Sequence, residues 1–188
     1  MRKKTTAELE RLNVDQYREA DKLPLVVVLD NVRSQHNVGA VFRTADAMRI
    51  ARVCLCGICC CPPNQELHKT ALGAEESVEW QYFKDTMDAV AALKAEGFTV
   101  YAIEQAHLSA TLEEVAEKVK DERLKVKGIA VVLGHEVFGV QQEVVDACDG
   151  CIEIPQYGTK HSMNVSVTAG IVMYRMAESL RAVKELKS

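Results

Sequence analysis

No part of this 188-residue sequence has the features of a membrane span or an export signal. Apolar runs such as Leu25–Leu29 and Ile129–Leu133 are far shorter than the ~20 residues that a membrane-spanning helix needs. The sequence does not start with a basic segment followed by an apolar one, as a secretory signal would. We therefore expect a soluble, cytoplasmic protein.

An excess of positive charge is also missing. The 23 Lys and Arg residues are outnumbered by 27 Asp and Glu residues, for a net charge of −4. Binding to nucleic-acid phosphates depends on Lys and Arg, so this balance counts mildly against a nucleic-acid partner. Any surface that binds RNA must therefore be local.

The seven cysteines are concentrated in one segment, in which five of them lie between positions 54 and 61. Such crowding would be hazardous in an oxidising compartment and indicates a reducing one. Adjacent cysteines on a strand point to opposite faces and rarely converge on one ion, so zinc is the minor alternative. We expect buried free thiols that act as small hydrophobic side chains, and no metal site.

The first apolar run is not followed by the G-x-G-x-x-G loop of a dinucleotide-binding domain, which makes a Rossmann domain improbable. Leu25–Leu29 is instead a β-branched run typical of a strand buried on both faces of a parallel sheet. Similar runs recur at 51–56, 98–103, 128–133 and 151–154, and helical patterns lie at 38–48, 85–96, 112–120 and from 163 to about 187. This alternation predicts an α/β fold, an open, mostly parallel sheet with helices on both faces.

The chain divides into residues 1–23, a charged arm, and residues 24–188, one domain with a single core. In the arm, Thr5 and Glu8 have the spacing of a capping box, and Leu9 and Leu12 lie three residues apart, which predicts a short amphipathic helix. The last predicted helix carries an apolar stripe that should pack on the sheet or on a second subunit. Its members are Val165, Val172, Met176, Leu180 and Val183.

Asn37 and Arg43 lie in the helix predicted after the first strand. Asn37 stands at the expected helix start, where a role as N-cap is an alternative to a functional one. Arg43 interrupts a largely apolar helix, and its alternative role is an ion pair with Asp46, three residues further on. Because the two residues are about two helical turns apart, they can serve different parts of one pocket.

Glu136 follows the predicted strand 128–133 and lies between Gly134 and Gly139. The C-terminal edge of the sheet, where this segment must lie, is where α/β proteins bind their ligands. The alternative is an exposed loop carboxylate.

A third polar group lies between the last predicted strand and the last helix. Ser162 and Asn164 follow a loop that contains Pro155 and Gly158. Either residue could cap the helix, but capping leaves the loop unexplained. Polar groups without partners are costly between a buried strand and a buried helix, so the segment suggests a pocket.

Taken in order, three segments resemble the three motifs of the SpoU (TrmH-like) RNA 2′-O-ribose methyltransferases of the SPOUT superfamily. They are N-x-G-A-x-x-R at 37–43, L-G-x-E-x-x-G-V at 133–140 and I-P-x-x-G-x-x-x-S-x-N-V-S-V at 154–167. The resemblance implies an α/β knot, in which the last strand and helix thread through a loop as a deep trefoil. It also implies a ribose-binding catalytic group made of Asn37, Arg43, Glu136, Ser162 and Asn164.

The same resemblance implies that the knot binds S-adenosyl-L-methionine in a bent shape, largely through backbone groups. The residues implied at this cofactor site are Gly134, Ile154, Met163, Glu104, Gln105, Leu133 and Gln156. Two of them depart from the usual pattern: Leu is commoner at Met163, and Met is frequent at Gln156. Both changes keep a similar size and shape. Residues 70–74 are implied to lie near the substrate.

Methyl transfer to a ribose hydroxyl needs alignment and removal of a proton from a weak acid, but no metal. A guanidinium is a reluctant base, so we expect Arg43 to hold the adjacent phosphate and polarise the 2′-hydroxyl. Asn37, Ser162 and Asn164 would fix the ribose and the loop, and Glu136 would orient Arg43 or Asn37.

The resemblance implies an RNA substrate and a homodimer formed through the last helix. We expect tRNA rather than rRNA, with the D-loop guanosine as first guess, because only about two dozen residues precede the first strand. The alternatives are an rRNA methyltransferase, a knotted RNA-binding protein without turnover, and an unrelated phosphate-ester enzyme. The sequence does not show the clustered Asp and His metal ligands that a phosphate-ester enzyme would need.

Overall fold

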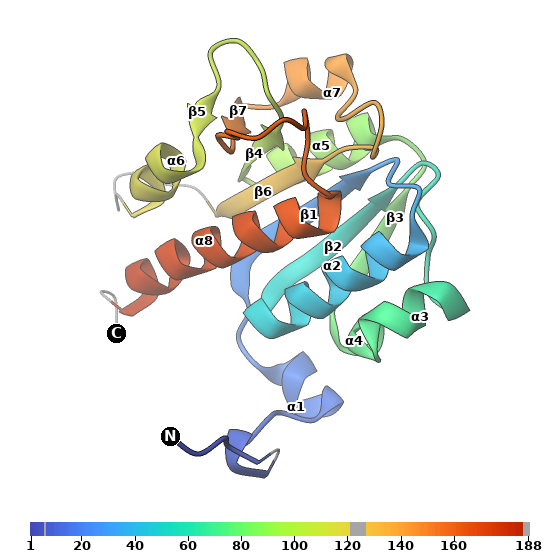
Figure 1. The fold of residues 1–188 in the computed structure, drawn as a ribbon, viewed down its shortest axis with the longest axis vertical. Coiled ribbons are helices and arrows are strands. Elements are labelled where there is room, and N and C mark those ends of the chain that lie inside the picture. Colours follow the sequence, from blue (N-terminus) through green and yellow to red (C-terminus); the bar gives the residue numbers. More distant parts are fainter. Residues whose placement is uncertain (6, 121–126, 186–188) are drawn as a thin grey trace.

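The computed structural model describes residues 1–5, 7–120 and 127–185. They form a seven-stranded sheet in the order β3-β2-β1-β6-β4-β7-β5, in which every pairing is parallel (Figure 1). The strands are β1 Leu23–Asp30, β2 Ile50–Cys56, β3 Trp80–Phe83, β4 Phe98–Ile103, β5 Ala110–Thr111, β6 Gly128–Leu133 and β7 Gly150–Glu153. The predicted parallel α/β sheet is confirmed.

Helices cover both faces of the sheet, because alternate residues of the central strands face opposite ways. On β1, Leu25, Val27 and Leu29 pack into one buried cluster, and Val26 and Val28 pack into the other. The first cluster includes side chains of α2 Gln35–Met48, α3 Gln65–Ala71, α6 Leu112–Val119 and α8 Val165–Glu185. The second includes side chains of α5 Thr86–Ala95 and α7 Gln142–Ala147. The short helix α4 spans Ala74–Ser77.

Two strands, three short helices (α3, α4 and α7) and two helix starts differ from the sequence predictions. The edge strands β3 and β5 were not predicted, because β3 has no buried residue and β5 has only two residues. Helix α2 starts before residue 38 because the Ser34 hydroxyl accepts the Asn37 N–H and acts as N-cap. Helix α8 starts at Val165, after the Asn164 side chain accepts the N–H groups of Ser166 and Val167.

The prediction for the N-terminal arm is only partly right. The Thr5–Glu8 pair starts just a 3-10 turn, Ala7–Leu9, and Leu9 and Leu12 stay exposed. A separate helix, α1 at Val14–Glu19, has the complete capping box, between Asn13 and Gln16. Tyr17 in α1 is buried, and the Arg18 guanidinium donates to the Glu76 carbonyl in α4 at 2.7 Å. The arm therefore packs on the domain through α1.

The apolar stripe of α8 faces the chain's own core. Val165, Val172 and Met176 are buried in the single chain, and Leu180 packs partly against the same cluster. Of the two alternatives for this stripe, packing on the sheet is therefore correct for Val172 and Met176, and the expectation that a dimer would bury these two side chains is wrong, whereas Leu180 stays partly exposed. Among the described residues, no helix has both the length and the apolar character that crossing a bilayer requires.

The cysteine-rich segment is split between the two faces of the sheet. Cys54 and Cys56 are buried on the face of the sheet that α5 covers, whereas Cys59 packs on the face that α2 covers. The Cys59 thiol donates to the Leu29 carbonyl at 3.2 Å. Burial raises the pKa of Cys54 to about 11 and that of Cys59 to about 12. All seven cysteines are free, and within the described ranges no three His, Cys, Asp or Glu side chains are grouped to hold a metal ion.

A buried carboxylate holds together the loops at the C-terminal edge of the sheet. Asp30, the last residue of β1, is fully buried. It accepts hydrogen bonds from the hydroxyl of Thr86, the side-chain amide of Asn31, and both the backbone and the side-chain amide of Gln141. These four bonds tie β1 to the starts of α5 and α7.

Replacing Asp30 with Asn should lower the free energy of unfolding by about 1–3 kcal/mol, because the new amide group brings donors to a site already filled with donors. Urea denaturation at constant m-value measures this change. The control is Asp88→Asn on the exposed side of α5, expected to change stability by less than about 0.5 kcal/mol. Equal stability of the two variants would show that Asp30 does not hold these loops.

Candidate active site

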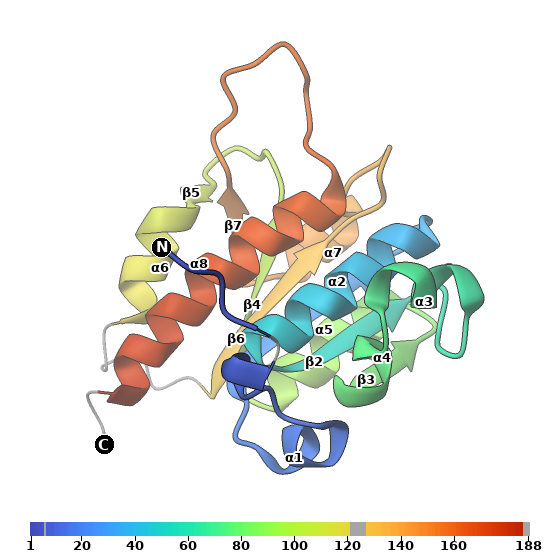
Figure 2. The same cartoon turned by 60° about the horizontal axis from the view of Figure 1, so that its bottom comes forward.

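A cavity of about 590 Å³ lies at the C-terminal edge of the sheet, between the segments that follow β4, β6 and β7. Its volume is in the range of small-molecule and cofactor sites. All seven residues predicted for the cofactor line it: Leu133, Gly134, Glu104, Gln105, Ile154, Gln156 and Met163. The segment between β7 and α8 forms one wall and arches beyond the body of the domain (Figure 2).

The loop after β6 is closed by its own backbone. The N–H of His135 donates to the Gly139 carbonyl at 3.0 Å, and the Gly139 N–H donates back at 2.8 Å. A Cβ on Gly134 would lie 2.0 Å from the Gly139 backbone, and Gly139 has a φ of +69°. Both glycines are therefore required for this turn. The Glu104 carboxylate accepts the N–H of Val140 at 2.8 Å and fixes the end of the loop.

Glu136 projects from this loop toward the start of α2. Its carboxylate accepts the backbone N–H groups of Arg33 at 3.0 Å and Ser34 at 2.9 Å, and the Asn37 Nδ2–H at 2.9 Å. Partial burial opposes ionisation, but these hydrogen bonds outweigh it and lower the pKa of Glu136 below its usual value. The carboxylate is thus ionised at neutral pH and half-buried, and the alternative of an exposed loop carboxylate is wrong.

Asn37 connects the three sequence motifs. Its amide group donates to Glu136, while its Oδ1 accepts the Asn164 Nδ2–H at 3.2 Å. Asn164 also caps α8 through its Oδ1, which is 2.8 Å from the Ser166 N–H. Capping therefore explains Asn164 in part, but Ser34 takes the N-cap position that Asn37 was thought to fill. The structure brings together Asn37, Glu136 and Asn164.

Arg43 and Ser162 remain apart from this chain of hydrogen bonds. Arg43 lies exposed on α2 and makes no ion pair with any described residue. The alternative of a pair with Asp46 is not observed, since Asp46 accepts the Ser77 hydroxyl at 2.7 Å. Ser162 is exposed and lines the cavity, as Glu136 and Asn164 do, whereas Asn37 and Arg43 lie outside its lining. Arg43 is therefore free to meet a ligand outside the cofactor-sized cavity.

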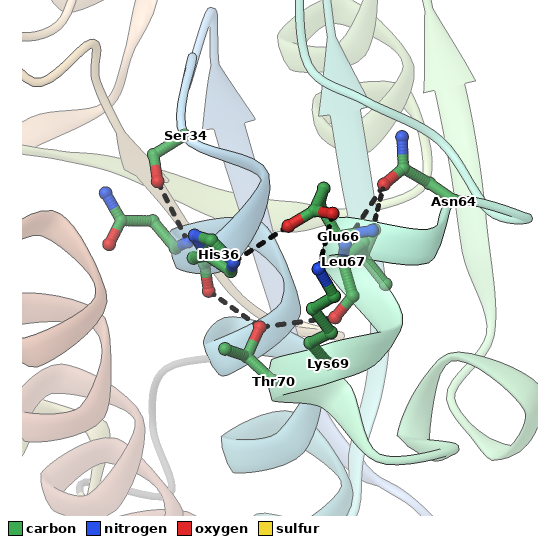
Figure 3. A network of polar contacts seen from close by, with 8 residues as sticks. Ser34, His36, Asn64, Glu66, Leu67, Lys69 and Thr70 are labelled. Carbon is green, nitrogen blue, oxygen red and sulfur yellow. Dashed lines mark hydrogen bonds and ion pairs between the residues drawn. The ribbon is translucent and has the colours of Figure 1, made fainter.

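Helix α3 packs closely on the start of α2 (Figure 3). A Cβ on Gly39 would lie 2.2 Å from the Thr70 hydroxyl, which donates to the His36 carbonyl at 3.0 Å. Glu66 forms ion pairs with His36 at 3.3 Å and with Lys69 at 2.6 Å. This network places Thr70, the first residue of the segment 70–74, beside the helix turn that carries Asn37.

Sequence reasoning missed two parts of the site. The Gln105 side chain does more than form a wall: its Nε2–H donates to the His161 carbonyl at 2.6 Å and tethers the segment before α8. His135 and Phe138 stack with their ring centroids 4.9 Å apart. The signal for this pair was a His and a Phe on either side of Glu136, but their contact depends on the turn between the two glycines.

Comparison with known proteins identifies the family. Residues 24–174 match the model of the SpoU rRNA Methylase family. The chain is 33% identical to a tRNA (guanosine(18)-2′-O)-methyltransferase of Thermus thermophilus, over 93% of this chain and 84% of the relative. It is 28% identical to the 23S rRNA (guanosine-2′-O-)-methyltransferase RlmB of Vibrio parahaemolyticus, over 97% of this chain and 70% of the relative.

Among solved structures, the fold is similar to that of a TrmH/SpoU tRNA modifying enzyme of A. aeolicus, with a TM-score of 0.75 and 26% identity. That match covers 93% of this chain and 84% of the other. The family match covers all three motifs and every residue that joins them across the site. The chain belongs to the SpoU rRNA methylase family.

Proposed function

We propose that the protein transfers a methyl group from S-adenosyl-L-methionine to a ribose 2′-hydroxyl of RNA. The observation that carries this proposal is the hydrogen-bonded chain Asn164–Asn37–Glu136 beside a cofactor-sized cavity in a SpoU-family chain. The relatives described above carry the same activity in their names, one on tRNA and one on rRNA.

The cavity suits the cofactor in size and in its mixture of apolar side chains and backbone polar groups. Leu133, Ile154 and Met163 would contact its apolar parts, and Gly134 would contribute backbone to the lining. Glu104, Gln105 and Gln156 would complete the walls. When bound, S-adenosyl-L-methionine supplies a methyl group on a positively charged sulfur, so the chain itself has to align the acceptor hydroxyl and manage its proton.

The polar residues divide this work. Asn37 and Asn164, each fixed by the other, would hold the ribose together with Ser162, whose hydroxyl has no partner among the described residues. Of Asn37 and Arg43, only Asn37 bonds to the Glu136 carboxylate, so Glu136 would orient Asn37 and not Arg43. It acts as a positioning residue whose negative charge is already satisfied by three N–H donors.

Arg43 would hold the phosphate next to the target ribose and polarise the 2′-hydroxyl. A guanidinium binds phosphate through a planar fork and stays charged, which favours this role over that of a free base. Its exposed position and its lack of an ion pair among the described residues leave the fork available.

The chain path favours the trefoil knot that the family resemblance implies. Strand β7 lies beyond β4 in the sheet, yet α8, which follows it, packs against β1 and α2 on the other side of β6. The last segment must therefore pass across the loops of β4 and β6.

The seven free cysteines support action in a reducing compartment, which we take to be the cytoplasm.

The RNA is most simply a tRNA with a guanosine target, since the tRNA-modifying relative is matched over more of its own length than the rRNA enzyme. An rRNA target is the alternative.

We propose that residues 24–188 form the methyltransferase domain and that the arm of residues 1–23 adds to the RNA surface. The basic side chains proposed for this surface are Arg2, Lys3, Lys4, Arg33, Lys160 and His161, of which Arg2 also pairs with Glu8.

We also propose that the active unit is a homodimer. The stripe first expected at its interface is buried in the single chain, but α8 has a second, exposed apolar face. This face consists of Val167, Ile171 and Tyr174, which lie at helical spacing. A two-fold dimer would double the few cations available for RNA.

Replacing Arg43 with Ala should lower kcat for methyl transfer at least about 100-fold, because a catalytic group is lost. The affinity for S-adenosyl-L-methionine should stay nearly unchanged, since Arg43 lies outside the cavity lining. Transfer of a labelled methyl group into an unmodified tRNA transcript and calorimetric binding of the cofactor measure the two effects. Arg43→Lys should fail as well, because an ammonium does not replace the planar fork.

The control for this test is Arg49→Ala, which removes an exposed guanidinium just past the other end of α2. Its kcat should remain within about two-fold of the wild type, as for a surface substitution away from the site. Retention of more than a tenth of the wild-type kcat in Arg43→Ala would remove Arg43 from the catalytic group.

Replacing Ile171 with Glu should convert the dimer to monomers, since a charge would be buried at the centre of the interface. Light scattering measures the mass, and an obligate interface should bury more than about 1,000 Å². Leu72→Glu, an equally apolar exposed position outside α8, should leave the mass unchanged. A wild-type monomer that methylates RNA at full rate would refute the dimer.

A further inference from the structure

Phe138 is the most exposed aromatic side chain at the cavity, with 83% of its surface accessible. It lies two residues after Glu136, on the loop between Gly134 and Gly139. Single apolar side chains on a surface are common and need no explanation by themselves. What distinguishes Phe138 is that the structure holds its ring in place without burying it.

Two sets of contacts fix the ring. The His135 ring stacks on it, with centroids 4.9 Å apart and an interplanar angle of 29°. His135 is fixed in turn, because its Nδ1 accepts the Val137 N–H at 3.0 Å and its backbone pairs with Gly139 in both directions. One face of the ring is thus braced in a closed turn. The conformational entropy that a binding partner would otherwise have to remove is already low.

The direction of the loop relates this ring to the ribose site. Glu136 points toward Asn37 and is bonded to it at 2.9 Å, while Phe138 stays in solvent at the rim of the same cavity. Asn164 is exposed at the edge of this cavity and Asn37 lies outside its lining, so a ribose held by these two residues would sit at the mouth of the cavity. The base of that nucleotide would then lie at the rim, where Phe138 is.

We propose that Phe138, braced by His135, is a stacking site for a purine or pyrimidine base of the RNA substrate, next to the ribose that receives the methyl group. This inference rests on the proposed function. Exposed aromatic rings bind unstacked bases of single-stranded RNA, and the face of any base suits them. The site selects for an RNA segment whose bases are splayed out and not paired.

A second copy of the chain is the other candidate occupant of this surface. The observations favour RNA, because Phe138 lies two residues from Glu136, which is hydrogen-bonded to Asn37. The apolar face available to a partner protein is instead on α8. Dissociation of a wild-type dimer by Phe138→Ala would assign the ring to an interface between copies and overturn the proposal.

The test uses the full chain and an unmodified tRNA transcript with 2-aminopurine in place of guanosine 18, the position named for the tRNA-modifying relative. Stacking quenches the fluorescence of this base. The variants are Phe138→Ala, Phe138→Leu and Phe138→Tyr, with Ile58→Ala as a control for loss of exposed apolar surface elsewhere.

Wild type and Phe138→Tyr should quench the probe. Phe138→Ala and Phe138→Leu should lose the quenching and bind the transcript on the order of 10-fold more weakly, which is the scale of one lost base–aromatic stack. Cofactor affinity should be the same in all variants. Normal quenching by Phe138→Leu, or absence of quenching by the wild type, would overturn the proposal.

Methyl transfer is measured in parallel with an unlabelled transcript and separates this inference from the proposed function. Quenching that depends on the Phe138 ring without any methyl transfer by the wild type would contradict the enzyme activity while supporting the stacking site. Methyl transfer with quenching that is insensitive to Phe138 would support the activity and contradict the stacking site.

Discussion

The arrangement of the site depends on the side-chain amide of Asn37. One end of the amide donates to Glu136 and the other accepts from Asn164, so a single planar group joins segments that are about 100 and 127 residues away in the sequence. The bond to Glu136 is partly buried and therefore has more effect than it would at the surface, whereas the bond to Asn164 is exposed.

The other features of the site support this link. Glu136 reaches Asn37 only because Gly134 and Gly139 allow the loop to fold back on itself. Ser34 caps α2, which keeps the Asn37 side chain free for the other loops. Below them, Asp30 fixes the start of α7 directly after the Glu136 loop. The cavity wall and the hydrogen-bonded residues Asn164, Asn37 and Glu136 are therefore parts of one unit. Such pre-organised side chains are what an enzyme needs to position a weakly acidic hydroxyl.

Much of this arrangement could be predicted, because strong local patterns determine it. The β-branched run of β1, which is buried on both faces, identified a central parallel strand, and the polar groups after β1, β6 and β7 had to meet at one sheet edge. The lining of the cavity by Gly134, Ile154 and Met163 agrees with the family resemblance. The roles assigned to the site residues remain predictions.

Other features depend on contacts that no local pattern encodes. Ser34 and Asn37 are equally good N-caps by residue type, so the sequence does not distinguish them; in the structure Ser34 caps α2 and Asn37 bonds to Glu136. The α8 stripe could face the sheet or a partner, and the packing of Val172 and Met176 on β1 settles that choice. β3 is an edge strand of only four residues with no buried side chain, and Arg43 lies outside the cavity lining, which its place in the first motif did not indicate.

A double-mutant cycle on methyl transfer tests the central role of the Asn37–Glu136 bond most directly. If Asn37→Ala and Glu136→Ala break the same unit, the double variant should be slower than the slower single variant by no more than about three-fold, because residues that act together are not additive. Near-ultraviolet circular dichroism would confirm that each variant is folded. Losses in kcat that multiply in the double variant would show that the two residues act independently and would contradict the account.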